Sequence, residues 1–356
     1  MTTKRRMIVL AEGRFSPLRS KTANGAIIYM RDEVLAIIDS TRVGQTAQQV
    51  LGYGGDIPVI KDLNEGLKFK PNTLLIGIAP SGGKLPESWR EMIKKALRNK
   101  LDVLNGLHTI FGDDAEFAAL AKEHGCTITD WRKIPESSEV VSQGHWKTRK
   151  AKTILTVGTD CNIGKMTTML EVRKEFLARG LKSDFVGTGQ TGMMISGRGV
   201  AVDSIISDYI SGCIEKEIDA SEKEGYDYIF VEGQGALTHQ GYSGVTFGLM
   251  HGTMPDAMLL CHQPTRLKDD YGITLPDINR LVKLHEEDIN IFRPTKVVGI
   301  GINSIGLSDE QSAAEAKKLE DATGLPAVDA FRFGGKRLAD ALVQYFRLTS
   351  EGLSND

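Results

Sequence analysis

The sequence contains few cysteines and no paired cysteine motif. Its four cysteines, Cys126, Cys161, Cys213 and Cys261, are scattered along 356 residues without a Cys-x-x-Cys pair. This spacing argues against both a zinc ribbon and a disulfide framework. We therefore expect a protein of a reducing cytoplasm, and no metal site is predicted.

An excess of charge of one sign and long hydrophobic runs are also absent. Forty-four Lys and Arg residues balance 46 Asp and Glu residues, for a net charge of −2. Such a balance gives no general attraction to nucleic acid or to an anionic membrane, so neither is expected as a partner. The apolar run 7–11 behind Lys4, Arg5 and Arg6 is too short for a signal peptide, and no run approaches the length of a membrane span.

Neither internal repeats nor low-complexity tracts are found, and the first part of the chain instead alternates apolar runs with helical patterns. Short Val-, Ile- and Leu-rich runs of this kind predict a doubly wound parallel sheet, which makes residues 1–140 a Rossmann-like domain. The loop 11–16 lacks the Gly-x-Gly-x-x-Gly pattern, although Asp39 ends the second run, so an intact dinucleotide site is not expected. The predicted strands are 7–10, 34–38, 58–60, 73–78, 102–104 and 127–128.

A second domain is predicted over residues 150–356. Apolar periodicity disappears between Pro135 and Lys152, and we expect a linker over these residues. In an open α/β sheet the loops at the carboxyl ends of the strands converge on the ligand. The fold class is thus α/β, with two doubly wound parallel-sheet domains, the second P-loop NTPase-like. Its predicted strands are 153–157, 183–186, 228–231, 257–261, 296–302 and 327–328.

A glycine-rich loop stands between a predicted strand and a predicted helix in this second domain. Residues 158–168 read Gly-Thr-Asp-Cys-Asn-Ile-Gly-Lys-Met-Thr-Thr, directly before the helical pattern of 169–179. Such a turn directs backbone N–H groups and the positive helix end at an anion, and the lysine adds a full charge. A turn without any ligand is the alternative. We predict a phosphate-binding loop whose ligand-binding residues are Gly158, Thr159, Asn162, Gly164, Lys165, Met166 and Thr167.

The loop departs from the usual phosphate-loop pattern in two ways. Five residues separate Gly158 from Gly164 where four are usual, and Met166 occupies the position of the Ser or Thr that binds magnesium. A thioether is a poor ligand for a hard cation that requires oxygen in octahedral geometry. The five-residue gap resembles the Gly-Thr-Asp-x-x-x-Gly-Lys loop of dethiobiotin synthetase and its relatives, in which Thr follows the lysine.

Two further loops supply acid–base and polar candidates. The apolar run 228–231 leads into Glu232-Gly233-Gln234-Gly235, and Glu232 could act as a general base, orient a metal-bound water, or accept hydrogen bonds from two glycine-rich turns. His239 is a second base candidate, and Asp160 in the phosphate loop is a third catalytic candidate. The loop 187–192 offers Thr188 and Gln190 as uncharged ligand contacts, with a lid that makes no contact as the alternative.

Three residues are candidates for binding a substrate. Asn303 ends a predicted strand, and Arg332 follows another, where a guanidinium could clamp a carboxylate in bidentate fashion. His108 ends a strand of the first domain and is either a ligand contact or a hydrogen-bonded structural residue. Cys161 is interpreted as a small filler residue rather than a covalent acyl carrier.

Taken together, five motifs resemble the D-glutamate N-acetyltransferase family, formerly a family of unknown function. They are residues 158–167, Gly-Thr-Gly-Gln-Thr-Gly-Met-Met at 187–194, Val-Glu-Gly-Gln-Gly at 231–235, Ile-Gly-Ile-Ala-Pro-Ser-Gly-Gly at 76–83 and Asn-Gly-Leu-His-Thr at 105–109. The resemblance covers nearly the whole chain and implies a Rossmann-like domain before a P-loop domain. It further implies acetyl transfer from acetyl-CoA to the amino group of D-glutamate, in amino-acid catabolism, and an acidic amino acid as the small-molecule partner.

Met166 is compatible with this chemistry, because a loop can hold the phosphates of CoA without magnesium when no phosphoryl group is transferred. The rival interpretation is an ATP- and Mg²⁺-dependent ligase or kinase that uses Lys165, Thr167, Asp160 and Glu232. A third interpretation is a nucleotide sensor without catalysis. We also expect a homo-oligomer.

Overall fold

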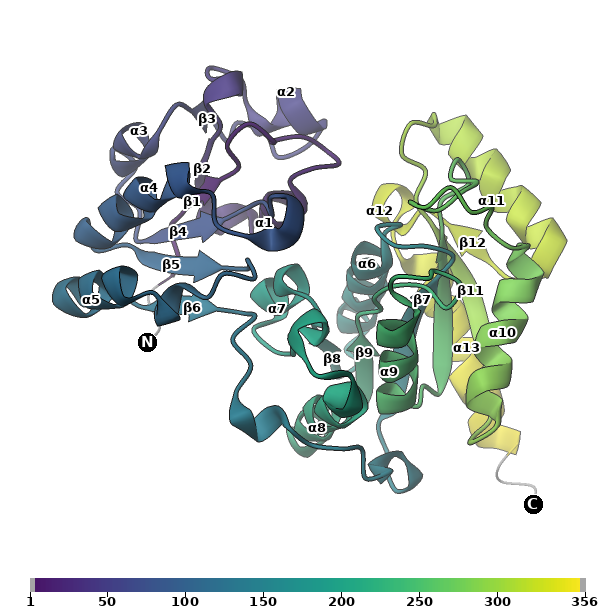
Figure 1. Ribbon diagram of the computed structural model, residues 1–356. Helices are drawn as coiled ribbons and strands as arrows, with labels where there is room; N and C mark the ends of the chain where they lie inside the picture. The colour runs from purple at the N-terminus through teal and green to yellow at the C-terminus, as the bar shows by residue number, and fades with distance from the viewer. Residues whose placement is uncertain (1–3, 353–356) are drawn as a thin grey trace. The chain divides into compact units, whose positions relative to one another are not determined.

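The computed structural model describes residues 4–352, and the chain divides into two compact units. The first unit contains Met1–Ile134 together with Met193–Gly197, and the second contains Pro135–Gly192 and Arg198–Asp356. The division at 134/135 coincides with the start of the predicted linker. Each unit contains one six-stranded sheet flanked by helices (Figure 1).

The first unit has the strand order β3-β2-β1-β4-β5-β6, and every pairing between these strands is parallel. This order is that of the Rossmann fold and confirms the predicted fold class for this half of the chain. Its strands are β1 (Met7–Leu10), β2 (Val34–Ile38), β3 (Val59–Ile60), β4 (Thr73–Ile76), β5 (Asp102–Asn105) and β6 (Ile128–Asp130). Its helices are α1 (Lys21–Tyr29), α2 (Ala47–Leu51), α3 (Leu63–Leu67), α4 (Glu87–Arg98) and α5 (Ala115–His124).

The carboxylate of Asp39, at the end of β2, is used within the first unit. Its Oδ2 accepts the Phe15 N–H at 2.9 Å, and its Oδ1 accepts the N–H and the hydroxyl of Thr41. The side chain is fully buried. Asp39 therefore fixes the loop after β1 rather than presenting a carboxylate to a ribose.

The second unit has the strand order β12-β11-β10-β7-β9-β8, again all parallel. Its strands are β7 (Lys152–Gly158), β8 (Ser183–Val186), β9 (Tyr228–Val231), β10 (Ala257–His262), β11 (Val297–Ile302) and β12 (Ala327–Val328). Its helices are α6 (Lys165–Ala178), α8 (Ile210–Lys223), α9 (Ser243–Thr253), α10 (Ile278–Asn290), α11 (Asp309–Thr323), α12 (Ala330–Phe333) and α13 (Lys336–Gly352), and α7 (Gln190–Ser196) has residues in both units.

The strand order of this second sheet changes direction between β7 and β10, which are neighbours in the sheet. From β7 it crosses to β8 and β9 on one side, and from β10 it continues to β11 and β12 on the other. Loops that follow two such neighbouring strands separate and leave a ligand position at their carboxyl ends. The glycine-rich loop follows β7 and the segment 263–277 follows β10, so both lie at this position.

Two helix starts differ from the sequence prediction. Helix α6 begins at Lys165 rather than at 169, because Gly164, with φ at 98°, ends the loop in a left-handed conformation that favours glycine. Helix α7 begins at Gln190, so the predicted loop 187–192 is helical in its second half.

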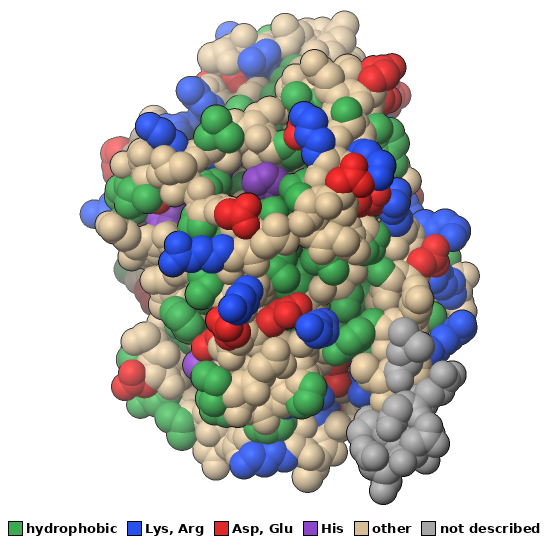
Figure 2. Space-filling view, turned by 90° about the vertical axis from the view of Figure 1, so that its right-hand side faces the viewer, with side chains coloured by type: hydrophobic (Ala, Val, Ile, Leu, Met, Phe, Trp, Pro, Cys, Tyr) green, Lys and Arg blue, Asp and Glu red, His purple; other side chains and the backbone are tan. Residues whose placement is uncertain are grey.

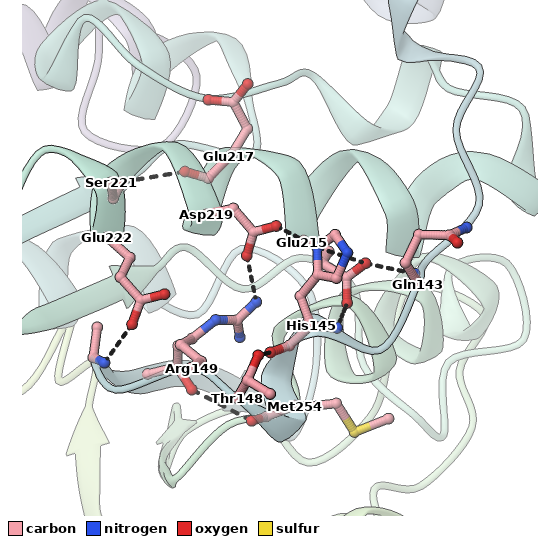
Figure 3. Close-up of polar contacts among 12 residues, drawn as sticks. Gln143, His145, Thr148, Arg149, Glu215, Glu217, Asp219, Ser221, Glu222 and Met254 are labelled. Carbon is pink, nitrogen blue, oxygen red and sulfur yellow. Dashed lines mark hydrogen bonds and ion pairs between the residues drawn. The ribbon is translucent and has the colours of Figure 1, made fainter.

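The segment 143–151, within the predicted linker, is held against α8 by three carboxylates on one helix face (Figure 3). Glu215 accepts the N–H groups of Gln143 at 2.6 Å and His145 at 2.8 Å. Asp219 pairs with the His145 ring at 2.6 Å, and Glu222 accepts two further backbone N–H groups, those of residues 150 and 151. The segment 143–151 has no apolar periodicity, and polar contacts that no sequence pattern predicts hold it in place.

Replacing Glu215 with glutamine is expected to lower the free energy of unfolding by about 1–3 kcal/mol. Glu215 is only 3% exposed, and an amide oxygen is a weaker acceptor for two buried N–H groups than a carboxylate. Urea unfolding of the variant and the parent protein measures the change. Glu224→Gln, at an exposed carboxylate that forms the C-cap of α8 and pairs with Arg198, is the control. Equal midpoints for all three proteins would contradict the role given to Glu215.

The surface carries both signs of charge. On the face drawn in Figure 2, acidic and basic side chains lie interspersed, in keeping with the net charge of −2. Within residues 4–352, no helix is long and apolar enough to cross a membrane.

Candidate functional site

The glycine-rich loop leads from β7 directly into α6, and the start of this helix has no side-chain cap. Its N-cap residue is Gly164, which provides no side-chain hydrogen bond, and its first turn contains no acidic residue. By contrast, α10 and α11 are capped by the side chains of Asp277 and Ser308. An uncapped N-terminus on a 14-residue helix favours an anion, because its first N–H groups and its dipole point outward.

Lys165 places its ammonium group inside the loop. The side chain is 6% exposed, and its Nζ donates to the Asp160 carbonyl at 2.6 Å. A buried ammonium at the start of an uncapped helix adds a full charge to the helix dipole. These two features suit a phosphate, and the individual ligand contacts of residues 158–167 stay predictions.

The position after Lys165 offers no oxygen to magnesium, and the Thr168 side chain is packed within the fold. Met166 is buried in the first turn of α6. Thr168 is buried too, and its side chain packs so closely on Gly301 of β11 that a Cβ there would lie 2.5 Å from its Cγ2. The residue that normally binds magnesium in such a loop is therefore a buried thioether, and Thr168 is packed against β11.

Arg266, in the loop after β10, contacts the glycine-rich loop at two points. Its Nε lies 3.0 Å from Asp160 Oδ2, and its Nη1 donates to the Cys161 carbonyl at 2.7 Å. Its Nη2 pairs with Asp270 at 2.7 Å. No motif in the sequence indicates Arg266 as a site residue. Only the strand order, which places the loops after β7 and β10 side by side, brings it to the glycine-rich loop.

Two other residues, His262 and Asn303, lie against the loop. The Thr159 hydroxyl lies 3.1 Å from His262 Nδ1, and burial lowers the pKa of His262 to about 4. The His262 ring is therefore neutral near pH 7, and its Nδ1 forms one hydrogen bond with this hydroxyl. The Asn303 side chain, a predicted substrate contact, lies beside Gly164, where a Cβ would be 3.7 Å from the Asn303 Cβ.

Glu232 lies at the end of β9, which pairs with β7. Its carboxylate is 1% exposed, and Oε2 accepts the N–H groups of Thr188 at 2.9 Å and Gly189 at 3.2 Å. The Thr188 hydroxyl donates to the Glu232 carbonyl at 2.7 Å and accepts from Gln234. The structure thus gives Glu232 the contacts of a hydrogen-bond acceptor and brings it together with Thr188. Its service as a base stays a prediction.

Gly233 permits the close approach of β9 to β7. A Cβ at this position would lie 1.7 Å from the Thr156 carbonyl oxygen and 3.1 Å from Lys165 Cδ. Any side chain would force these two strand ends apart. The glycine is therefore required where Glu232 and Lys165 come together.

Replacing Gly233 with alanine is expected to lower the free energy of unfolding by about 1–3 kcal/mol, the usual cost of overpacking a filled interior. Gly244→Ala is the matched control, because a Cβ there meets nothing within 4 Å. Denaturant unfolding of both variants measures the difference. Equal stability of the two variants would show that the strand ends are not packed as described.

Two predicted substrate residues, Arg332 and His108, form hydrogen bonds within their own units. The guanidinium of Arg332, on α12, donates to Asp309 at 3.0 Å and to the Ser304 carbonyl at 3.1 Å, so it is engaged within the protein. His108 is exposed in the first unit and its N–H bonds the Gly83 carbonyl. Neither contact tests a role in substrate binding, and both roles stay predictions.

Comparisons with known proteins agree with this architecture. Residues 40–134 match the DUF1611_N Rossmann-like domain, and residues 140–339 match the DUF1611_C P-loop domain, each described as a domain of unknown function. A crystal structure of a DUF1611 family protein from Anabaena variabilis superposes with a TM-score of 0.90 at 33% identity, covering 96% of this chain and 99% of that one.

Two curated relatives carry an enzyme name. A D-glutamate N-acetyltransferase of Tritonibacter scottomollicae is 40% identical over 284 residues, which are 79% of this chain and 84% of the relative. A protein of the same name from Pseudoalteromonas sp is 36% identical over 273 residues, 76% of this chain and 81% of the relative.

Proposed function

This chain belongs to the DUF1611 family, and we propose that it transfers the acetyl group of acetyl-CoA to the amino group of D-glutamate, as a step in amino-acid catabolism. Its curated relatives identify it as an N-acetyltransferase, which confirms the predicted enzyme class. The donor and the acceptor are the proposed part.

The observation that carries the proposal is the start of α6. An uncapped helix N-terminus with the buried ammonium of Lys165 suits a phosphate, while Met166 offers no oxygen to magnesium. CoA contains a diphosphate and a ribose phosphate, and acetyl transfer moves no phosphoryl group. A phosphate site without a magnesium ligand therefore suits CoA better than ATP.

The reaction requires a neutral amine and a protonated leaving group. A base removes a proton from the ammonium of the acceptor, and the amine nitrogen attacks the thioester carbonyl carbon. The nitrogen then loses a second proton as the carbon–sulfur bond breaks, and the CoA thiolate takes up that proton. We propose Glu232 as the base, because it is a buried carboxylate on the strand next to the phosphate loop. The same carboxylate fixes the backbone of the Thr188 loop.

Steady-state release of free thiol from acetyl-CoA tests the proposal. We expect release with D-glutamate, slower release with L-glutamate, and no requirement for Mg²⁺. An ATP-dependent ligase or kinase would instead form ADP from ATP and a small acid in the presence of Mg²⁺. ADP formation without thiol release would overturn the proposed function.

A further inference from the structure

The ring of His239 has one satisfied nitrogen and one without a partner. Its Nδ1 accepts the Gly241 N–H at 3.2 Å, so this nitrogen carries a lone pair. In the neutral ring the proton must then be on Nε2. This nitrogen is buried, forms no hydrogen bond, and lies 4.0 Å from Asp160 Oδ1 in the glycine-rich loop.

We propose that His239 is a neutral hydrogen-bond donor, whose Nε2–H binds an oxygen atom of the ligand held by the glycine-rich loop. A buried donor without a partner is rare in folded proteins, and a ligand atom is one of its ordinary explanations. His239 is 2% exposed, and it lies against the loop that the proposed function assigns to CoA. The inference rests on that function and deepens it.

A base at this position would need the opposite arrangement of protons. To accept a proton, Nε2 would have to present a lone pair, which requires the proton on Nδ1, where the Gly241 N–H already points. The ring is also held in place, stacked on Tyr242 at 4.7 Å between centroids and tilted against Tyr271 at 5.3 Å. We therefore propose His239 as a hydrogen-bond donor in place of the predicted base.

A metal ion fits this position no better. Ligand atoms of Asp160, Cys161 and His239 lie within 4.8 Å of one another, close enough to suggest a cation site. A histidine that ligates through one nitrogen normally donates a hydrogen bond from the other, whereas His239 Nδ1 accepts one. The Arg266 guanidinium, 3.0 Å from Asp160 Oδ2, already supplies a positive charge there.

Arg266 also explains how an anionic ligand can approach a buried carboxylate. Asp160 is fully buried, and alone it would repel a phosphate. With Arg266 paired to it, the charge of Asp160 is compensated and the His239 donor faces a neutral pair. The oxygen that Nε2–H binds is then either a phosphate oxygen of CoA or the carbonyl oxygen of the thioester.

Two substitutions separate a donor from a base. His239→Gln retains an N–H donor and cannot act as a base, whereas His239→Phe retains a ring between the tyrosines and no donor. For a phosphate contact we expect His239→Phe to weaken CoA binding by about 10- to 100-fold in calorimetric titration, and His239→Gln to stay within about threefold of the parent. For a thioester contact we expect His239→Phe to lower kcat by a similar factor and His239→Gln to keep kcat close to that of the parent, while the Kd of CoA stays constant in both variants.

Either pattern supports the proposal. Equal losses in both variants would indicate a base or a metal ligand, and unchanged binding and turnover in His239→Phe would indicate a structural histidine, so both results overturn it. A parent protein that binds no CoA would overturn the proposed function and, with it, the ligand assigned to His239.

The position of the proton can be measured without any ligand. Nitrogen NMR of protein labelled in its seven histidines distinguishes protonated from bare ring nitrogens, and His239→Gln assigns the signal. His285 is an internal reference for a ring with its proton on Nδ1, because its Nδ1 lies 2.7 Å from the Leu281 carbonyl and must donate to it. We expect the proton of His239 on Nε2, and a proton on Nδ1 would overturn the inference whether or not the protein binds CoA.

Discussion

Replacing Glu232 with glutamine is expected to lower kcat for acetyl transfer by about 10²- to 10⁴-fold, the usual contribution of a general base. The Kd of CoA should change little, because the amide oxygen of glutamine can still accept the N–H groups of Thr188 and Gly189. Thiol release gives kcat, and calorimetric titration with CoA gives the Kd.

Glu215→Gln is the matched control for this experiment. Glu215 is also a buried carboxylate that accepts two backbone N–H groups, but it holds the segment 143–151 and lies outside the glycine-rich loop. We expect the control to be destabilised and to keep its kcat. If Glu232→Gln also keeps its kcat and only loses stability, Glu232 is the acceptor that the hydrogen bonds describe and not the base.

Replacing Lys165 with alanine is expected to weaken CoA binding by about 10- to 150-fold, which corresponds to roughly 1.5–3 kcal/mol for a hydrogen bond to a charged group. The ammonium is buried at the start of α6, where it adds its charge to the uncapped helix end. Titration with CoA measures the loss. Lys174→Ala, an exposed lysine on the same helix, is the control.

A second variant at position 165 distinguishes the loss of the ammonium group from a change in the structure of the loop. Lys165 donates to the Asp160 carbonyl, so alanine could also loosen the loop. Lys165→Met retains the apolar stem that packs against Gly233 and removes only the ammonium. We expect the same loss of affinity in both variants. Unchanged CoA binding in Lys165→Met would contradict the assignment of this loop to a phosphate.

Much of the fold could be predicted because buried parallel strands are short apolar runs. Met7–Leu10 and Val34–Ile38 are such runs, and the structure has strands at these residues. The helical pattern in the sequence begins at residue 169, four residues after the true start of α6, because the residues from Gly164 to Thr168 are typical of a loop. A local sequence pattern indicates that a helix follows, but it does not indicate which backbone N–H groups come first in that helix.

The candidate site was only partly predictable, because its contacts depend on the strand order. Lys165, Glu232 and Thr188 each stand in a motif that follows a strand, so the sequence indicates them as candidates. Arg266 follows β10 in a loop without a motif, and only the pairing of β10 with β7 brings it to Asp160. Arg332 shows the converse, since a sequence shows a guanidinium but not the aspartate that already engages it.

The measurement that tests the central claim most directly is the detection of N-acetyl-D-glutamate by mass spectrometry, with acetyl-CoA labelled in the acetyl group and EDTA in excess. If the loop before α6 holds CoA without magnesium, the label appears in the product, one product forms for each thiol released, and EDTA does not slow the reaction. Absence of labelled product, or a rate that EDTA abolishes and Mg²⁺ restores, would contradict this account.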